Sequence, residues 1–394
     1  MLKTVKFLFA LTSASFSPVV VNAQCPFSGL LRGSNISSTF HNENSYPEGQ
    51  SRVANTSGTF SWYRDYYYNF TKPPPEADLH RSLGQSSCGI TMQVPTLPRH
   101  KLKLSKNRQD YNDFVLAIYD AFVAETKAPQ QLFTPAGALR IAFHECIPFN
   151  QYATGRGGCR GDIALEVSQR FPPNDRLVFT YNRISELINS GKFGRITFAD
   201  AVHIAASVAV QAYGGPKYEV KIGRAYDFTS EDVCPDPKIC WPPPNFPQGN
   251  PITVLSDFIQ KMFKNAGFRD PTKAVVVSSG AHTFGGSRIF PGFDWTKDPY
   301  AFNNGYHQTV MNWWKHGGPN IGGFDFLKSL GLSSNECPIG LFHSDMMLGD
   351  PRLPFRQFTE VYANNQSAFF SDFASFMKEC SLKGVANPHE LVDP

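Results

Sequence analysis

The apolar positions of this chain follow the period of a helix from residue 107 onward. Their spacing stays close to 3.6 residues at Tyr111, Phe114, Val115, Ile118, Phe122 and Val123. A second helix is expected over 133–146. In 197–213, Thr197 is placed as an N-cap, and apolar residues cover every face of the turns that follow. This pattern predicts a helix that is buried on all sides.

The rest of the chain repeats this pattern with long connections. Helices are expected over 254–266, 271–282, 302–315 and 365–378, a short strand at 218–222, and a proline-rich loop at 235–251. No internal repeat is visible. The fold class that follows is a mainly α domain with little β structure, covering 106–394.

The N-terminus has the pattern of a secretory signal. Lys3 and Lys6 precede an apolar run over 7–21, and Val21-Asn22-Ala23 resembles a small-residue cleavage site. We therefore expect residues 1–23 to be removed from a secreted, extracellular protein. A membrane anchor is the alternative, although the run is short and interrupted by Ser and Pro. No later segment is apolar for long enough to cross a bilayer.

Residues 24–105 differ in composition from the domain that follows them. They are rich in Ser, Asn, Gly and Pro, and they contain the glycosylation sequons at Asn35, Asn55 and Asn69. A fourth sequon lies at Asn365, in the domain that follows. We expect an irregular, glycosylated N-terminal extension. The aromatic run over 60–68 is either a sugar-binding platform or a cover for a neighbouring core.

Charge and cysteine content narrow the class of protein. The 394-residue chain has a net charge of +4, and its Lys and Arg residues are scattered, which argues against nucleic acid or an anionic membrane as a partner. An even number of cysteines, eight, is typical of a secreted protein with disulfides. Cys234 and Cys240 bracket a loop and are expected to pair, and Cys25 with Cys88 is a second candidate pair.

The most informative residues lie in two separate motifs. Arg140 and His144 are four residues apart in 139–146, so a helix places guanidinium and imidazole on the same side. An isolated histidine, His282, lies far downstream in 275–288. A cation beside a titratable base, with a second histidine elsewhere, suits a buried iron cofactor with acid–base chemistry on one side and metal ligation on the other.

Four segments in order resemble the plant, fungal and bacterial haem peroxidase superfamily, over about residues 107–385. They are 139–146, 275–288, 342–352 and 362–373. The resemblance implies a monomer with about ten or more helices in two subdomains that enclose haem b. It also implies a cycle in which hydrogen peroxide gives an oxoferryl intermediate, and small phenols or aromatic amines reduce it in one-electron steps.

The resemblance assigns roles to individual residues. His144 would move the proton of peroxide, Arg140 would stabilise charge on the breaking O–O bond, and Asn174 would accept the other N–H of His144. On the opposite side, His282 would ligate the haem iron, and Asp345 would accept its second N–H.

Two aromatic positions indicate a hybrid of two branches of this superfamily. Phe143, beside the haem, is typical of secreted members, whereas Trp295 resembles the intracellular type that includes ascorbate and cytochrome c peroxidases. Trp295 could donate to Asp345 through its indole N–H. It either holds a radical or simply packs against His282.

The resemblance also bears on metal ions near the haem. A proximal cation, calcium or potassium, would be bound by oxygens of Thr283, Thr296, Asp298, the Ala301 carbonyl and Asn303. The family's distal calcium is expected to be absent, because Glu145 and Arg160 stand where ligand aspartates would. Cys146 and Cys159 are expected to clamp that loop with a disulfide instead.

Several donor sites of the superfamily are missing from the sequence. The positions of a manganese site are Phe133, Gly137 and Arg288, the position of a surface radical tryptophan is Val277, and that of an ascorbate-binding arginine is Pro291. Arg288 is instead expected to pair with a haem propionate. The rival prediction is a catalytically silent extracellular protein, binding haem or carbohydrate on a peroxidase-like scaffold.

Overall fold

A computed structural model of the chain describes residues 93–127, 134–152, 157–168, 174, 177–225, 252–287, 293–318, 330 and 339–394. The chain divides into two compact units, Met1–Asn55 and Thr56–Pro394, and every described residue belongs to the second. The predicted signal, most of the extension, the loop at 235–251 and Cys25, Cys88, Cys234, Cys240 and Cys337 lie outside the described residues.

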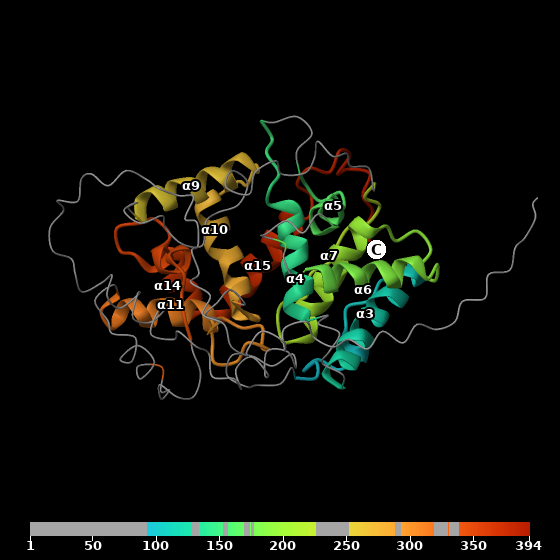
Figure 1. The fold of residues 1–394 in the computed structure, drawn as a ribbon, viewed down its shortest axis with the longest axis horizontal. Coiled ribbons are helices and arrows are strands. Elements are labelled where there is room, and N and C mark those ends of the chain that lie inside the picture. Colours follow the sequence, from blue (N-terminus) through green and yellow to red (C-terminus); the bar gives the residue numbers. More distant parts are fainter. Residues whose placement is uncertain are drawn as a thin grey trace, which may run out of the picture. The chain divides into compact units, whose positions relative to one another are not determined.

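The described part is mainly helical, as predicted (Figure 1). The longer helices are α3 (Gln109–Lys127), α4 (Pro135–Cys146), α6 (Val178–Asn189), α7 (Phe198–Ala212), α9 (Ile252–Asn265), α10 (Pro271–Ser279), α11 (Gly305–Lys315), α14 (Arg356–Asn364) and α15 (Gln366–Cys380). Short helices are η1 (Arg99–Lys101), α5 (Ile163–Ser168), η4 (Gly280–Thr283), α13 (His343–Met346) and η6 (Met347–Gly349). The strands β1 (Gly286–Ser287) and β2 (Phe293–Asp294) pair antiparallel. None of the described helices is both long and apolar enough to cross a membrane.

The described helices pack in two groups. In one group α7 contacts α3, α4 and α6, and in the other α10 contacts α9, α14 and α15, while α11 packs on α14 and η4. The expected pair of subdomains is therefore visible in the packing. His144 belongs to the first group through α4, and His282 belongs to the second through η4.

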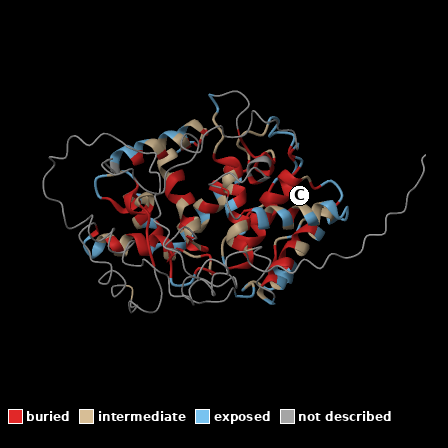
Figure 2. Cartoon of the chain, in the orientation of Figure 1, coloured by how far each residue is buried: buried red, intermediate tan, exposed pale blue. Residues whose placement is uncertain are grey.

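Helix α7 forms the centre of the first group. Thr197 caps it by accepting a hydrogen bond from Asp200 N, and all residues from Phe198 to Ala212 are buried (Figure 2). The prediction of a helix buried on every face is confirmed. Helix α4 lies on α7 and begins in the way its sequence favours, with Thr134 as N-cap and Pro135 at the first helical position.

Two predicted elements differ from the structure. The strand expected at 218–222 is reduced to one isolated bridge between Ile222 and Val392, so that prediction was wrong for most of its length. The helix expected at 271–282 ends as an α-helix at Ser279 and continues as the 3₁₀ turn η4. Rings of His307 and Phe369 pack against the backbone at Gly280, where a Cβ would lie 2.4 Å from Phe369.

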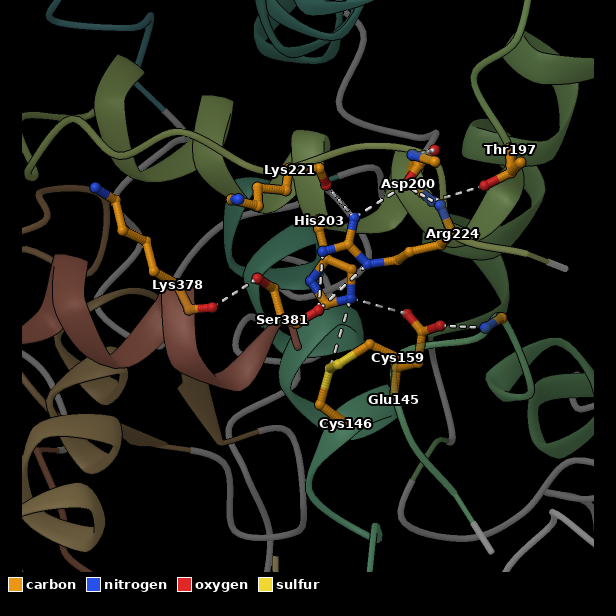
Figure 3. A network of polar contacts seen from close by, with 12 residues as sticks. Glu145, Cys146, Cys159, Thr197, Asp200, His203, Lys221, Arg224, Lys378 and Ser381 are labelled. Atoms are coloured by element: carbon orange, nitrogen blue, oxygen red, sulfur yellow. Dashed lines mark hydrogen bonds and ion pairs between the residues drawn. A yellow bond between two sulfur atoms is a disulfide. The ribbon is translucent and has the colours of Figure 1, made fainter. Parts of the chain in front are cut away.

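A buried ion pair joins Asp200 of α7 to Arg224, which also bonds the residue that follows α15 (Figure 3). Arg224 Nη1 lies 2.9 Å from Asp200 Oδ1, and both side chains are 0% exposed. Arg224 Nη2 also donates to the Ser381 carbonyl at 2.8 Å, and the N–H groups of Gly223 and Arg224 donate to Asp200. Because both charges are fully bonded, the pair is stable in the interior and links the two helix groups.

We expect Arg224→Met to lower the free energy of unfolding by about 3–5 kcal/mol, because it leaves the Asp200 charge buried without its partner. Denaturant unfolding of the purified protein measures this change. The matched control is Arg99→Met, which removes an ion pair between Arg99 and Asp120. Because these two side chains are 52% and 56% exposed, the free energy of unfolding should change by no more than about 1 kcal/mol. Equal losses in the two variants would contradict the prediction.

Candidate active site

The predicted distal residues come together on and beside α4. Arg140 and His144 lie one turn apart, and Arg140 Nε donates to His144 Nε2 at 3.2 Å. His144 Nδ1 lies 2.7 Å from Oδ1 of Asn174, which is buried. Since the arginine nitrogen can only donate, Nε2 is the bare nitrogen of the neutral ring and Nδ1 carries the proton.

The surroundings of His144 keep it neutral. Burial and the nearby Arg140 charge hold the pKa of His144 well below 6.5, although the hydrogen bond that Nδ1 donates to Asn174 acts in the opposite direction. A lowered histidine pKa means that the folded state loses stability as the pH falls below 6.5, because the unfolded chain binds the proton more readily. At neutral pH the ring therefore has the form that a general base requires.

Phe143 lies next to the base on the same helix. Its ring centroid is 6.2 Å from that of His144, 6.4 Å from Phe263 of α9 and 6.5 Å from Phe376 of α15. The ring therefore reaches the second helix group from α4. It forms an apolar wall beside the distal histidine.

A disulfide and a buried polar pair support the distal helix from behind (Figure 3). Cys146, the last residue of α4, is bonded to Cys159, as expected. Glu145 accepts a hydrogen bond from Gly161 N through Oε1, and its Oε2 lies 3.6 Å from His203 Nε2. Burial raises the pKa of Glu145 to about 8 and holds the pKa of His203 well below 6.5, so both side chains favour their neutral forms.

His282 occupies the second group of helices, in the turn η4. Its Nδ1 lies 3.0 Å from Asp345 Oδ1, which leaves Nε2 as the nitrogen for a further ligand. The His282 side chain is 39% exposed, whereas that of Asp345 is 1% exposed. An accessible imidazole held by a buried carboxylate is the arrangement of an oriented metal ligand.

Asp345 is the centre of the proximal site. Oδ1 accepts from His282 and from Tyr306 Oη at 2.7 Å, and Oδ2 accepts from Trp295 Nε1 at 2.8 Å and from Phe342 N at 2.7 Å. These donors compensate for the burial of its charge. The predicted contacts of Asp345 with His282 and Trp295 are both present.

Trp295 and Tyr306 enclose the imidazole of His282. The Trp295 ring stacks on it at 4.1 Å with an interplanar angle of 10°, and the Tyr306 ring meets it edge-on at 5.3 Å and 82°. Tyr306 is not among the residues that the sequence motifs predict. A signal for it exists, because Tyr306 lies on the buried stripe of α11, and a buried tyrosine hydroxyl needs a hydrogen-bond partner.

Only some of the predicted cation ligands contact one another. Thr283 Oγ1 donates to Asn303 Oδ1 at 2.9 Å, and Thr296 Oγ1 lies 3.4 Å from the Thr283 carbonyl. Asp298 is exposed and accepts from Tyr300 N, while Ala301 N lies 3.4 Å from the Asp298 carbonyl oxygen. The calcium or potassium site stays a prediction.

The remaining predicted positions belong to the haem-propionate contact and to the donor sites expected to be missing. Arg288, Phe133 and Pro291 lie outside the described residues. Gly137 lies in the first turn of α4, and Val277 is buried in α10.

The residues of the two sides fit a haem. The distal helix α4 reaches the second helix group, which carries His282, through the Phe143 ring. One histidine is bonded to a carboxylate and offers Nε2, and the other has a bare Nε2 beside an arginine. An imidazole ligand and polar distal groups in apolar surroundings suit a protein-bound haem iron.

Comparison with known proteins agrees with this class of site. The family model described as "Peroxidase" matches residues 118–365, and the chain belongs to the peroxidase family. It is a haem peroxidase, with the mainly helical fold expected of that superfamily.

Three similar proteins come from Arabidopsis thaliana, Oryza sativa subsp. japonica and Debaryomyces hansenii. "Peroxidase 41" of Arabidopsis thaliana is 30% identical over 308 residues, 70% of this chain and 86% of that protein. "Probable L-ascorbate peroxidase 3, peroxisomal" of Oryza sativa subsp. japonica is 29% identical over 255 residues, 64% of this chain and 73% of that protein. "Putative heme-binding peroxidase" of Debaryomyces hansenii is 27% identical over 248 residues, 60% of this chain and 52% of that protein.

Changes at Asn174 should move the pH dependence of the reaction with hydrogen peroxide in two directions. Asn174→Ala removes a hydrogen bond that raises the pKa of His144, so the acid limit of the reaction should shift to lower pH and the rate should fall. Asn174→Asp places a carboxylate at Nδ1, which favours the charged ring, so the acid limit should shift to higher pH. Stopped-flow rates across pH measure both, and a common direction of shift would contradict the role of Asn174.

Proposed function

We propose that this protein is a secreted haem b peroxidase that reduces hydrogen peroxide and oxidises small phenols or aromatic amines in one-electron steps. The observation that carries the proposal is the bare Nε2 of His144, held beside Arg140, together with the carboxylate-bound His282 on the second helix group. The haem, when bound, supplies the redox chemistry of the iron. The protein supplies the ligand, the base and the charge.

The distal side chains would divide the acid–base work. Nε2 of His144 accepts a proton from the peroxide oxygen that approaches the iron, and then returns it to the departing oxygen. Arg140 stabilises the negative charge that develops as the O–O bond lengthens. Asn174 holds the tautomer in which Nε2 is available throughout.

The proximal side chains would hold and tune the iron. His282 would be its protein ligand through Nε2. Asp345 accepts a hydrogen bond from the Nδ1–H group of His282. This bond gives the imidazole partial anionic character, which stabilises oxidised iron. Trp295 shares this carboxylate and stacks on the ligand, so it is the nearest described indole for a radical.

Three sequence features support the finer parts of the proposal. The apolar run after Lys3 and Lys6, the sequons and the cysteine content support secretion. Donors that meet the haem edge are favoured, because the manganese-site positions have no acidic residue and Val277 stands at the radical-tryptophan position. Relatives named as ascorbate peroxidases make ascorbate the second donor to test.

We expect His144→Ala to keep its haem absorption band but to react with hydrogen peroxide about 10² to 10⁴ times more slowly, since a general base is lost. His282→Ala should instead lose or change the haem band itself. The control is His316→Ala, an exposed histidine at the end of α11, which should leave both unchanged. Stopped-flow spectra before and after peroxide measure these effects. A parent protein without a haem band would favour the catalytically silent alternative.

Peroxide-dependent turnover with a small phenol should exceed turnover with ascorbate. The position expected for an ascorbate-binding arginine holds proline, Pro291, which offers no cation to the anionic donor. Steady-state rates for guaiacol and ascorbate, at equal concentrations of haem-loaded enzyme, test this preference. A faster reaction with ascorbate would overturn the proposed donor class.

A further inference from the structure

We propose that Tyr306 is a positioning residue of the proximal site, which sets how strongly Asp345 draws on the Nδ1 proton of His282. Tyr306 and His282 donate to the same oxygen of that carboxylate. The inference rests on the proposed role of His282 as the haem ligand. It adds a tyrosine to the histidine and aspartate expected at the site.

The distances show how the carboxylate oxygen is shared. Tyr306 Oη lies 2.7 Å from Asp345 Oδ1, within the usual range of hydrogen bonds from a hydroxyl to a carboxylate. His282 Nδ1 lies 3.0 Å from the same atom, longer than a charge-assisted N–H bond usually is. The hydroxyl therefore takes the stronger share of the charge on Oδ1, and the imidazole takes the weaker share.

Tyr306 is held in this position by its surroundings. Its side chain is fully buried, and its helix also buries Val310 and Trp313 on the same stripe. Burial, followed by the charge of Asp345, raises the pKa of Tyr306 well above 10. The hydrogen bond to Asp345 requires the protonated phenol, and this direction of shift favours that form.

The sharing has a defined consequence for the ligand. A stronger bond from Nδ1–H to a carboxylate makes the imidazole more anionic, and an anionic ligand favours the higher oxidation state of iron. Tyr306 limits this effect by withdrawing charge from Oδ1. Without its hydroxyl, His282 would become the only described donor to that oxygen.

The test compares Tyr306→Phe with Tyr362→Phe in the haem-loaded protein. Tyr362 is also buried and donates to a carboxylate, Asp372 Oδ2 at 2.9 Å, but that aspartate does not contact His282 in any described hydrogen bond. The readouts are the ferric/ferrous reduction potential and the iron–histidine stretching frequency in resonance Raman spectra of the ferrous protein. A structural role alone would move neither of them selectively.

We expect Tyr306→Phe to lower the reduction potential and to raise the iron–histidine frequency, whereas Tyr362→Phe leaves both at the parent values. Replacing Tyr306 with 3-fluorotyrosine keeps the shape and makes the phenol a stronger donor. It should shift both readouts in the opposite direction, and it serves as the test if Tyr306→Phe does not fold.

The outcomes separate this inference from the proposed function. His282→Ala must abolish the iron–histidine band, and a persisting band would overturn both the ligand assignment and the inference. If that band is lost in His282→Ala but Tyr306→Phe and the fluorotyrosine protein match the parent in both readouts, only the role of Tyr306 is overturned.

Discussion

The buried charge of Asp345 is the constraint that organises the second group of helices. A carboxylate in the interior is stable only when its oxygens are hydrogen-bonded, and Asp345 obtains donors from four different segments. These are the turn η4, the segment after β2, the start of α11 and the backbone at Phe342. Satisfying one charge therefore fixes the positions of a ligand, an indole and a phenol at the same time.

The first group of helices solves the opposite problem, that of keeping a base uncharged. Arg140 gives His144 a neighbouring positive charge, and burial removes the water that would stabilise an imidazolium, so both effects lower the pKa of His144. Helix α4 must also be held in place. The disulfide of Cys146 and the packing of α4 on α7 hold it.

Local spacing predicted the parts of this site that depend on one helix. Arg140 and His144 are a pair because of the α-helical period, and the Thr197 cap and buried α7 follow from residue type and pattern. The buried stripe of α11 indicates that Tyr306 needs a partner, but the identity of that partner depends on how α11 lies beside α13, which carries Asp345. The strand expected at 218–222 failed for a related reason, since only Ile222 has a described β-bridge partner, Val392.

The pair formed by Glu145 and His203 shows how the same burial acts with opposite signs on an acid and a base. The raised pKa of Glu145 makes the folded state lose stability as the pH rises from 4.5 towards 8, and the lowered pKa of His203 makes it lose stability as the pH falls below 6.5. In the folded protein both groups are uncharged between the lowered pKa of His203 and the raised pKa of Glu145, about 8. Since Glu145 follows His144 directly on α4, the pH range in which the support of the helix is neutral overlaps the range in which the base is neutral. One low-dielectric environment thus keeps the base and the pair behind it uncharged over a common pH range.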